Sequence, residues 1–128
     1  MAKIPENVRQ AVEAAGPYPI ATASPEGKPN LVYVSFLRIL DDETIQVADN
    51  FFFKTRQNLD ANPALTVTAL HPDGGGCFQI KGPVEILTEG AVYDDCVSWV
   101  HGRSAKLPAK AAVNLHVDEI YSGAERIV

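Results

Sequence analysis

Apolar residues recur at every fourth position near the start of the chain. Ile4, Val8 and Val12 stand at i, i+4 and i+8, and Gly16-Pro17 follows them. This spacing places the apolar side chains on one face of a helix, and the glycine and proline end it. The pattern predicts a short amphipathic helix over residues 5–15 that covers a hydrophobic core.

Most of the remaining pattern is typical of β-strands. Runs that alternate apolar with polar residues, or that are rich in β-branched and aromatic residues, lie between turn-forming residues. The expected strands cover residues 18–23, 30–40, 44–48, 64–70, 77–87 and 112–117. Gly82-Pro83 within the fifth strand indicates a bulge or a sheet edge. Asp73-Gly74-Gly75-Gly76 before that strand indicates a flexible hairpin tip.

Two further helices are expected between the strands. Thr55 can accept the free N–H groups of a first turn and Pro63 forbids continuation, so a short helix is predicted over residues 55–62. A third helix is predicted over residues 89–101. Its apolar face consists of Val92, Cys96, Trp99 and Val100. Because the elements lack regular βαβ alternation, the predicted fold is mainly β, a six-stranded antiparallel barrel with peripheral helices.

Composition narrows the class of protein. The 128 residues suit a single domain over residues 1–128 with one site. A net charge of −5 with 21% charged residues offers no broad basic surface, so no nucleic-acid partner is expected. No apolar run approaches the roughly 20 residues that span a bilayer, and the N-terminus lacks the apolar core of a signal peptide. The expected location is therefore cytoplasmic, without membrane attachment.

Other reactive side chains do not form a recognisable site. Cys77 and Cys96 lie far apart, so they predict neither a disulfide nor a zinc site and are expected to be half-buried thiols. The three histidines have no ligand spacing, so no metal is expected. Ser35 lacks the flanking glycines of a nucleophile elbow, which argues against hydrolysis. No catalytic residue is assigned.

The segment with the most chemical character runs from Asp49 to Leu59. Phe51–Phe53 lead into Lys54 and Thr55 at the predicted helix start, where free N–H groups and the helix dipole favour an anion. Lys54 would supply a charge, Thr55 a hydroxyl, and Arg56 further neutralisation. These residues outline a phosphate site. The alternative is that Thr55 is only a cap, the cations are solvated and the phenylalanines belong to the core.

Segments along essentially the whole chain match a known pattern. They are Pro29-Asn30-Leu31-Val32, Leu37 to Asp41, Val47 to Asp49, Phe53 to Leu59, Asn62-Pro63, Gly76 to Gly82 and Val117 to Tyr121. On these segments the chain resembles the pyridoxamine 5′-phosphate oxidase-related FMN-binding split-barrel family, in particular its small FMN-binding-protein members. The resemblance implies a split barrel that works as a homodimer, with FMN bound between the two protomers.

The resemblance also implies which residues bind the flavin. Lys54 and Thr55 would hold the phosphate, and backbone groups of the central strands would meet the ring. Trp99 is expected to be a core residue, and the alternative is that it approaches the flavin at a dimer interface. The full candidate set is Val32, Tyr33, Val34, Val47, Ala48, Asp49, Phe53, Lys54, Thr55, Arg56, Asn58, Gln79 and Trp99.

The expected function is that of an FMN-binding flavoprotein. It would carry electrons or reduce or oxidise a small substrate, with a nicotinamide cofactor or a redox protein as donor. Because flavin itself performs electron transfer, the lack of a catalytic dyad is no objection. The chain is shorter than the enzymes that oxidise pyridoxamine phosphate and lacks their extra basic residues, which argues against vitamin B6 chemistry. The alternatives are a barrel that only sequesters a small molecule, or the same fold with a deazaflavin or haem.

Overall fold

A computed structural model describes residues 2–128 and shows three helices within them. The helices are α1 (Glu6–Ala14), α2 (Lys54–Ala61) and α3 (Ala91–Arg103). The strands are β1 (Tyr18–Ala23), β2 (Pro29–Val34), β3 (Leu37–Asp41), β4 (Thr44–Asp49), β5 (Ala64–Leu70), β6 (Cys77–Leu87), β7 (Ala111–His116), β8 (Glu119–Ser122) and β9 (Glu125–Arg126). Of the helices in this part of the chain, none is long and apolar enough to cross a bilayer.

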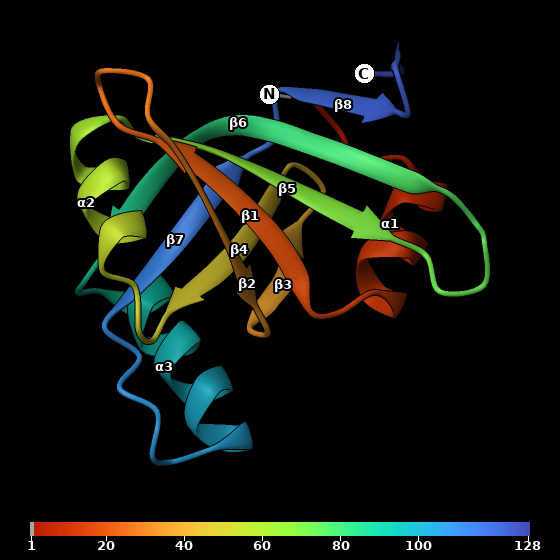
Figure 1. Ribbon diagram of the computed structural model, residues 1–128. Helices are drawn as coiled ribbons and strands as arrows, with labels where there is room; N and C mark the ends of the chain where they lie inside the picture. The colour runs from red at the N-terminus through yellow and green to blue at the C-terminus, as the bar shows by residue number, and fades with distance from the viewer. Residues whose placement is uncertain (1) are drawn as a thin grey trace.

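The strands form one curled antiparallel sheet. Their order is β2-β1-β5-β6-β7-β4-β3, with β8 paired to β6 and β9 to β8. Figure 1 shows the long strand β6 arching over the top of the barrel, with the helices at its periphery. α1 packs against β3 and β5, α2 against β1 and β2, and α3 against β7. This arrangement confirms the predicted split barrel.

Strand β6 changes partners at Gly82-Pro83. Up to Lys81 it pairs with β8, and from Val84 onward the same side of the strand pairs with β7. A Cβ atom on Gly82 would lie 2.0 Å from the carbonyl oxygen of His116, so only glycine allows this close backbone approach. The pairing register shifts by one residue here, from Lys81 opposite Glu119 to Val84 opposite Leu115, so the expected irregularity is the corner where one strand serves both halves of the barrel.

The predicted strand over residues 30–40 is wrong in one respect. The chain bends at Ser35-Phe36, so β2 pairs with β1 while β3 pairs with β4. The Ala48 amide donates a hydrogen bond to the Phe36 carbonyl (3.0 Å) and secures the bend. β-Propensity continues across these two residues, so only the separate partner strands reveal the break. The short strands β8 and β9 were also not expected, which gives nine strands within residues 2–128 instead of six.

Two hydrophobic clusters hold the fold together. The larger lies between the barrel strands and α1, with Val8 and Val12 at 0% and 2% exposure as the helix pattern predicts. The smaller joins α3 to β4 and β7 through Ala48, Cys96 and Val100. Such burial is the main stabilising contribution in a barrel of this size.

The predicted apolar face of α3 is only partly correct. Cys96 and Val100 are buried and Trp99 is half-buried, but Val92 is 43% exposed in the first helical turn.

The two thiols differ in exposure, since Cys77 is exposed and Cys96 is buried. Burial raises the pKa of the Cys96 thiol, with a smaller opposing effect from Arg38. The expectation of two half-buried thiols is therefore wrong.

Replacement of Gly82 by alanine should destabilise the fold strongly. The added methyl group would overlap the His116 carbonyl oxygen, so we expect a loss of about 3 kcal/mol or more in the free energy of unfolding. Urea denaturation followed by circular dichroism measures this loss. The matched control is Gly102→Ala in α3, where a Cβ meets nothing within 4 Å. There we expect a gain of up to about 1 kcal/mol, and equal behaviour of the two variants would contradict the prediction.

Candidate functional site

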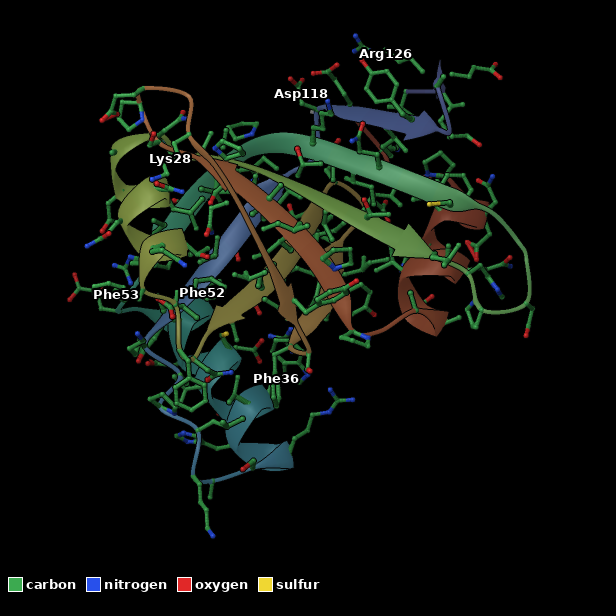
Figure 2. All side chains as sticks on the ribbon, viewed as in Figure 1. Lys28, Phe36, Phe52, Phe53, Asp118 and Arg126 are labelled. Carbon is green, nitrogen blue, oxygen red and sulfur yellow. The ribbon has the colours of Figure 1, made fainter. Side chains whose placement is uncertain are left out.

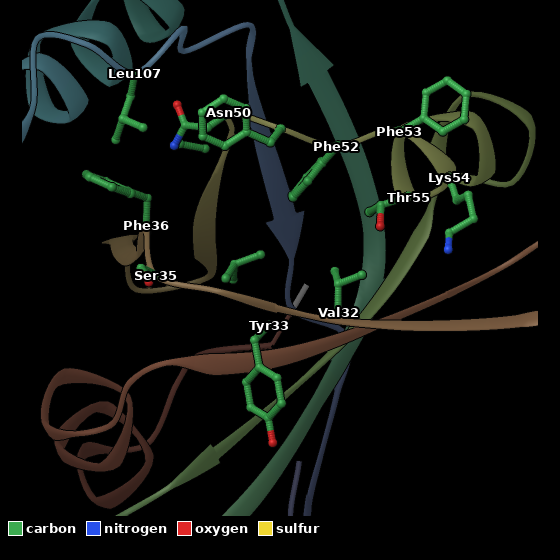
Figure 3. Close-up of a pocket in the computed structure, with 13 residues that line it drawn as sticks. Val32, Tyr33, Ser35, Phe36, Asn50, Phe52, Phe53, Lys54, Thr55 and Leu107 are labelled. Carbon is green, nitrogen blue, oxygen red and sulfur yellow. The ribbon is translucent and has the colours of Figure 1, made fainter.

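A groove of about 420 Å³ lies between β2, the end of β4 and the start of α2. Its lining residues are Val32, Tyr33, Val34, Ser35, Phe36, Ala48, Asn50, Phe51, Phe52, Phe53, Lys54, Thr55 and Leu107. Figure 3 shows Val32 and Phe52 facing one another across it, while Tyr33 points away on the other side of β2. This volume falls within the roughly 300–1,000 Å³ of small-molecule sites. The groove is mainly apolar, with a polar end at α2.

The polar end is the first turn of α2. The helix begins at Lys54, with Phe53 in the cap position and no side-chain cap, so the expectation that Thr55 caps the helix is wrong. Lys54 is exposed, and no carboxylate among residues 2–128 lies within ion-pair distance of it. In Figure 3 the side chains of Lys54 and Thr55 both extend toward β2. A free cation and the free N–H groups of a helix start together suit a bound anion.

Thr55 carries a buried hydroxyl group with an unused donor. The residue is 2% exposed, and its Oγ1 accepts a hydrogen bond from Asn30 Nδ2 at 3.0 Å. No residue in the described part of the chain accepts the hydroxyl proton. A hydroxyl has one proton to donate, and here it is free to serve an acceptor in the groove. The Asn30 bond thus prepares Thr55 to act as a donor.

Thr22 links the same region to α2. Its Oγ1 accepts hydrogen bonds from Asn58 Nδ2 at 3.0 Å and from Asn30 Nδ2 at 3.4 Å. Asn62 Nδ2 donates to the Ala23 carbonyl at 3.2 Å. Asn58 in α2 and Asn62 in its C-terminal cap position therefore hold the helix against β1. In this arrangement the Asn58 amide faces Thr22 rather than the groove.

A buried carboxylate lies directly behind the groove. Asp49, at the end of β4, is 0% exposed and accepts a hydrogen bond from the Phe52 amide at 3.0 Å. Arg56 Nη1 lies 3.1 Å from one carboxylate oxygen and Lys110 Nζ 3.6 Å from the other. A buried carboxylate is tolerated only with such partners. Asp49 therefore ties together three segments that meet at the groove.

Arg56 is occupied by carboxylates on both sides. Besides Asp49, its Nε contacts Asp60 Oδ1 at 3.1 Å. Burial by itself lowers the pKa of Arg56, but the hydrogen bonds to Asp60 and Asp49 outweigh it and raise that pKa overall. The charge of Arg56 is balanced within the protein, whereas that of Lys54 faces the groove.

The aromatic loop that follows β4 is held by hydrogen bonds to the segment before β7. Asn50 Oδ1 accepts from the Ala109 amide at 3.0 Å, and Lys110 Nζ donates to the Phe52 carbonyl at 3.0 Å. Phe52 packs on the main cluster, while Phe51 and Phe53 are 74% and 73% exposed. Figure 2 places Phe52 and Phe53 beside the start of α2. The alternative that all three phenylalanines belong to the core is thus wrong for two of them.

The candidate residues divide into two groups by position. Those that line the groove are Val32, Tyr33, Val34, Ala48, Phe53, Lys54 and Thr55. Those outside its lining are Val47, Asp49, Arg56, Asn58, Gln79 and Trp99. Val47 is fully buried in the core, and Gln79 lies on β6 opposite Thr68 and Tyr121. The second group therefore supports or lies apart from the groove in this chain.

Several lining residues were not expected from the sequence. They are Ser35, Phe36, Asn50, Phe51, Phe52 and Leu107. Phe51 and Phe52 belong to the aromatic run that precedes Lys54, and this run is the feature of the sequence that could have indicated them. Phe36 and Leu107 lie far from it in the sequence and reach the groove only through the bend and the segment after α3.

These features define a class of protein, a split barrel with an apolar groove and a helix start that carries free hydrogen-bond donors and an exposed lysine. The sequence matches the pattern of the family described as Pyridoxamine 5′-phosphate oxidase over residues 4–123. The chain belongs to this family. It is also 32% identical to the uncharacterized protein MJ0282 of Methanocaldococcus jannaschii over 105 residues, which cover 80% of this chain and 70% of that protein.

Solved structures share the fold. HupZ of Group A Streptococcus superimposes with a TM-score of 0.84 at 24% identity, over 98% of each chain. An FMN-binding protein of Syntrophomonas wolfei gives 0.73 at 21% identity, over 91% of this chain and 83% of that one. An F420 reductase gives 0.71 at 21% identity, covering 92% of this chain and 98% of that one. HutZ, a haem storage protein of Vibrio cholerae, gives 0.71 at 12% identity, over 94% and 95%. Proteins with this fold thus include an FMN-binding protein, an F420 reductase and a haem storage protein.

Replacement of Asp49 by asparagine should loosen the wall of the groove. The change leaves Arg56 and Lys110 without their buried counter-charge, so we expect a loss of about 2–4 kcal/mol in the free energy of unfolding. The measurement is urea denaturation. Asp60→Asn removes the exposed partner of the same arginine and should change stability by less than about 0.5 kcal/mol. Equal losses in both variants would show that burial of Asp49 does not matter.

Proposed function

We propose that the groove binds FMN, with the phosphate at the start of α2. The observation that carries this proposal is the buried Thr55 hydroxyl, whose oxygen is taken by Asn30 and whose proton is free. Lys54 adds a positive charge at the same end. Together with the backbone N–H groups of the first turn, they offer several donors to one phosphate.

The rest of the groove suits the flavin ring. No aspartate or glutamate is among the described residues that line it, so no negative side chain there repels a phosphate dianion. Val32, Val34 and Phe52 supply apolar surface for a planar ring. FMN, rather than riboflavin, uses both ends of such a groove.

In this proposal the chain binds and orients the cofactor and shields it from water. FMN supplies the electron-transfer chemistry. The protein then acts as an electron carrier or as an oxidoreductase for a small substrate. A nicotinamide cofactor or a redox protein is the proposed donor.

The lining also bears on the other cofactors found in this fold. Haem iron is usually held by histidine, cysteine, methionine or tyrosine. Among the described residues that line the groove, Tyr33 alone is of these types, and its side chain points away on the other side of β2 (Figure 3), which favours a flavin over haem. A deazaflavin would use the same apolar walls, and its mass distinguishes it from FMN.

We further propose that a second copy of the chain completes the site. β2 is an edge strand, and its Leu31 and Tyr33 side chains are 66% and 71% exposed. Phe51 and Phe53 add exposed aromatic surface beside the groove. Adjacent exposed apolar side chains of this size are typical of an interface. A homodimer formed along the β2 edge would cover these side chains and enclose the open side of the groove next to that strand.

The cofactor assignment is tested on the purified protein. We expect absorption bands of oxidised flavin that bleach with dithionite, and release of FMN on denaturation. Mass spectrometry of the released molecule separates FMN from a deazaflavin and from haem. A colourless protein that does not bind added FMN would refute the proposal and favour a barrel that sequesters another small molecule.

Removal of the two phosphate contacts should weaken FMN binding selectively. For Lys54→Ala combined with Thr55→Val we expect a loss of about 3 kcal/mol or more, because two charge-assisted contacts disappear. Isothermal titration of the apoprotein with FMN and with riboflavin measures the effect. Riboflavin has no phosphate, so its affinity should stay nearly unchanged. Lys3→Ala removes another exposed lysine and is the control. Equal losses for both flavins would contradict a phosphate site at α2.

Charged substitutions on β2 should break the dimer. We expect sedimentation at twice the 13.8 kDa of one chain, and for Leu31→Glu with Tyr33→Glu a shift to the monomer with weaker FMN binding. The control is Leu70→Glu, which alters a side chain that is 63% exposed at the β5–β6 hairpin. A monomeric wild-type protein that binds FMN would refute the dimer and leave the cofactor assignment standing.

A further inference from the structure

A second cleft lies next to the groove and belongs to none of the features assigned so far. It has a volume of about 500 Å³ and lies between the end of α1, the segment that leads into β1, β3 and the second half of α3. We call it the arginine cleft and define it by Glu13, Tyr18, Arg38, Trp99 and Arg103. Its walls are more polar than those of the groove.

The arginine cleft and the groove share a wall. Ser35 lines both. The neighbouring Phe36 lines the groove, and its ring packs edge-on against Trp99 with 5.5 Å between the ring centroids. Figure 2 shows Phe36 close to α3, and Figure 3 shows it at the end of the groove away from Lys54. A ligand in the cleft is therefore one side-chain layer from the apolar end of the groove.

Arg38 is held rigidly on the wall of the cleft. Its Nε and Nη2 both donate to Gln46 Oε1, at 3.0 and 2.7 Å, and Gln46 Nε2 donates to Asn114 Oδ1 at 3.0 Å. Gln46 and Asn114 are 0% and 5% exposed. Buried polar side chains are costly unless fully bonded, and this chain of bonds ends at the Arg38 guanidinium. The guanidinium also lies 4.3 Å over the Trp99 ring, which fixes its plane.

One edge of that guanidinium remains available. Nη2 also contacts Asp95 at 2.7 Å, whereas Nη1 has no hydrogen-bond partner within residues 2–128. Its two N–H groups can bond an oxyanion without disturbing the buried bonds. Because the group is already in place, a ligand loses little by ordering it.

Arg103 supplies a second cation to the cleft. It has no carboxylate within ion-pair distance in the described part of the chain, and its guanidinium lies 5.6 Å over the Phe36 ring. Burial raises the pKa of Tyr18, the charge of Arg103 lowers it, and the charge of Glu13 raises it further.

Two carboxylates limit what the cleft can accept. Asp95 balances Arg38 and Glu13 stands on the rim. Among the described residues, Arg103 is then the cation of the cleft without a carboxylate at ion-pair distance, and one such cation suits one small anionic group and not a polyanion. The aromatic rings of Trp99 and Tyr18 offer packing for an apolar body attached to that group.

We propose that the arginine cleft binds a small organic oxyanion, a carboxylate or a phosphate ester, beside the cofactor groove. Arg38 Nη1 and Arg103 hold the charged oxygens, and the body of the ligand lies along Trp99 toward Ser35. The role of this ligand as reaction partner rests on the proposed function, whereas its binding does not.

The test uses Trp99, which is the single tryptophan of the chain. Its fluorescence is followed in FMN-free protein titrated with benzoate, with phenyl phosphate and with the uncharged benzyl alcohol. Saturable changes with at least one of the two anions and none with benzyl alcohol support the proposal. A response to benzoate alone identifies a carboxylate ligand, and a response to phenyl phosphate alone identifies a phosphate ester. The absence of a saturable response to either anion would overturn the proposal.

A variant separates binding in the cleft from binding elsewhere. Arg103→Gln should weaken the anion affinity about tenfold or more, because a charge-assisted contact is lost. Arg9→Gln removes an arginine of α1 that pairs with Glu6 and Asp42 outside the cleft, and should leave the affinity unchanged. Equal affinities of both variants for the anion would place the anion elsewhere and refute the cleft.

The FMN titration of the same samples keeps the two proposals apart. Anion binding that depends on Arg103 in a protein that fails to bind FMN would refute the proposed function and support the arginine cleft. FMN binding without any response to the anions would refute the arginine cleft and support the proposed function.

Discussion

The buried carboxylate of Asp49 is the constraint on which the site region depends. A charge with no exposure to water must be matched inside the protein, and three segments supply the matching groups. α2 contributes Arg56, the aromatic loop contributes the Phe52 amide, and the segment before β7 contributes Lys110. Because all three converge on one carboxylate, the start of α2 is held beside the end of β4 and opposite β2.

This constraint separates the roles of two neighbouring cations. Arg56 turns inward to Asp49 and Asp60, and its charge is balanced there. Lys54 stands two residues earlier, and no such partner lies near it in the described chain. Asn30 also orients Thr55, since it donates a hydrogen bond to the Thr55 hydroxyl oxygen and leaves the hydroxyl proton free. The donors at the start of α2 are thus oriented before any ligand arrives.

A second buried polar system lies on the other side of the bend at Ser35-Phe36. Gln46 is hydrogen-bonded to both Asn114 and Arg38, and in the same way Asn30 is hydrogen-bonded to both Thr22 and Thr55. In each case buried polar groups fix a side chain at the wall of a cavity. An FMN-binding protein, an F420 reductase and a haem storage protein share this barrel, so the fold alone does not decide the chemistry.

The sequence by itself determined the fold class, the three helices within a few residues and the chemical character of the segment from Asp49 to Leu59. These features depend on local periodicity, on turn residues and on the helix start, which neighbouring residues encode. It also indicated Gly82-Pro83 as an irregular point. The family followed from motifs spread along the chain, and the pattern match over residues 4–123 agrees with them.

Only the tertiary structure decided where those residues point. Residues 112–117 were expected only as a strand, and it is the neighbouring strand β4 that buries the polar side chain of Asn114, which accepts a hydrogen bond from Gln46 and is 5% exposed. Contacts between segments far apart in the chain decide three further features. They pair Arg56 with Asp49 while Lys54 has no such partner in the described chain, they bend the chain at Ser35-Phe36, and they bring Leu107 to the groove. Local secondary-structure propensity does not predict such partners, because the energy of a buried charge or of a close backbone contact depends on the groups that pack against it.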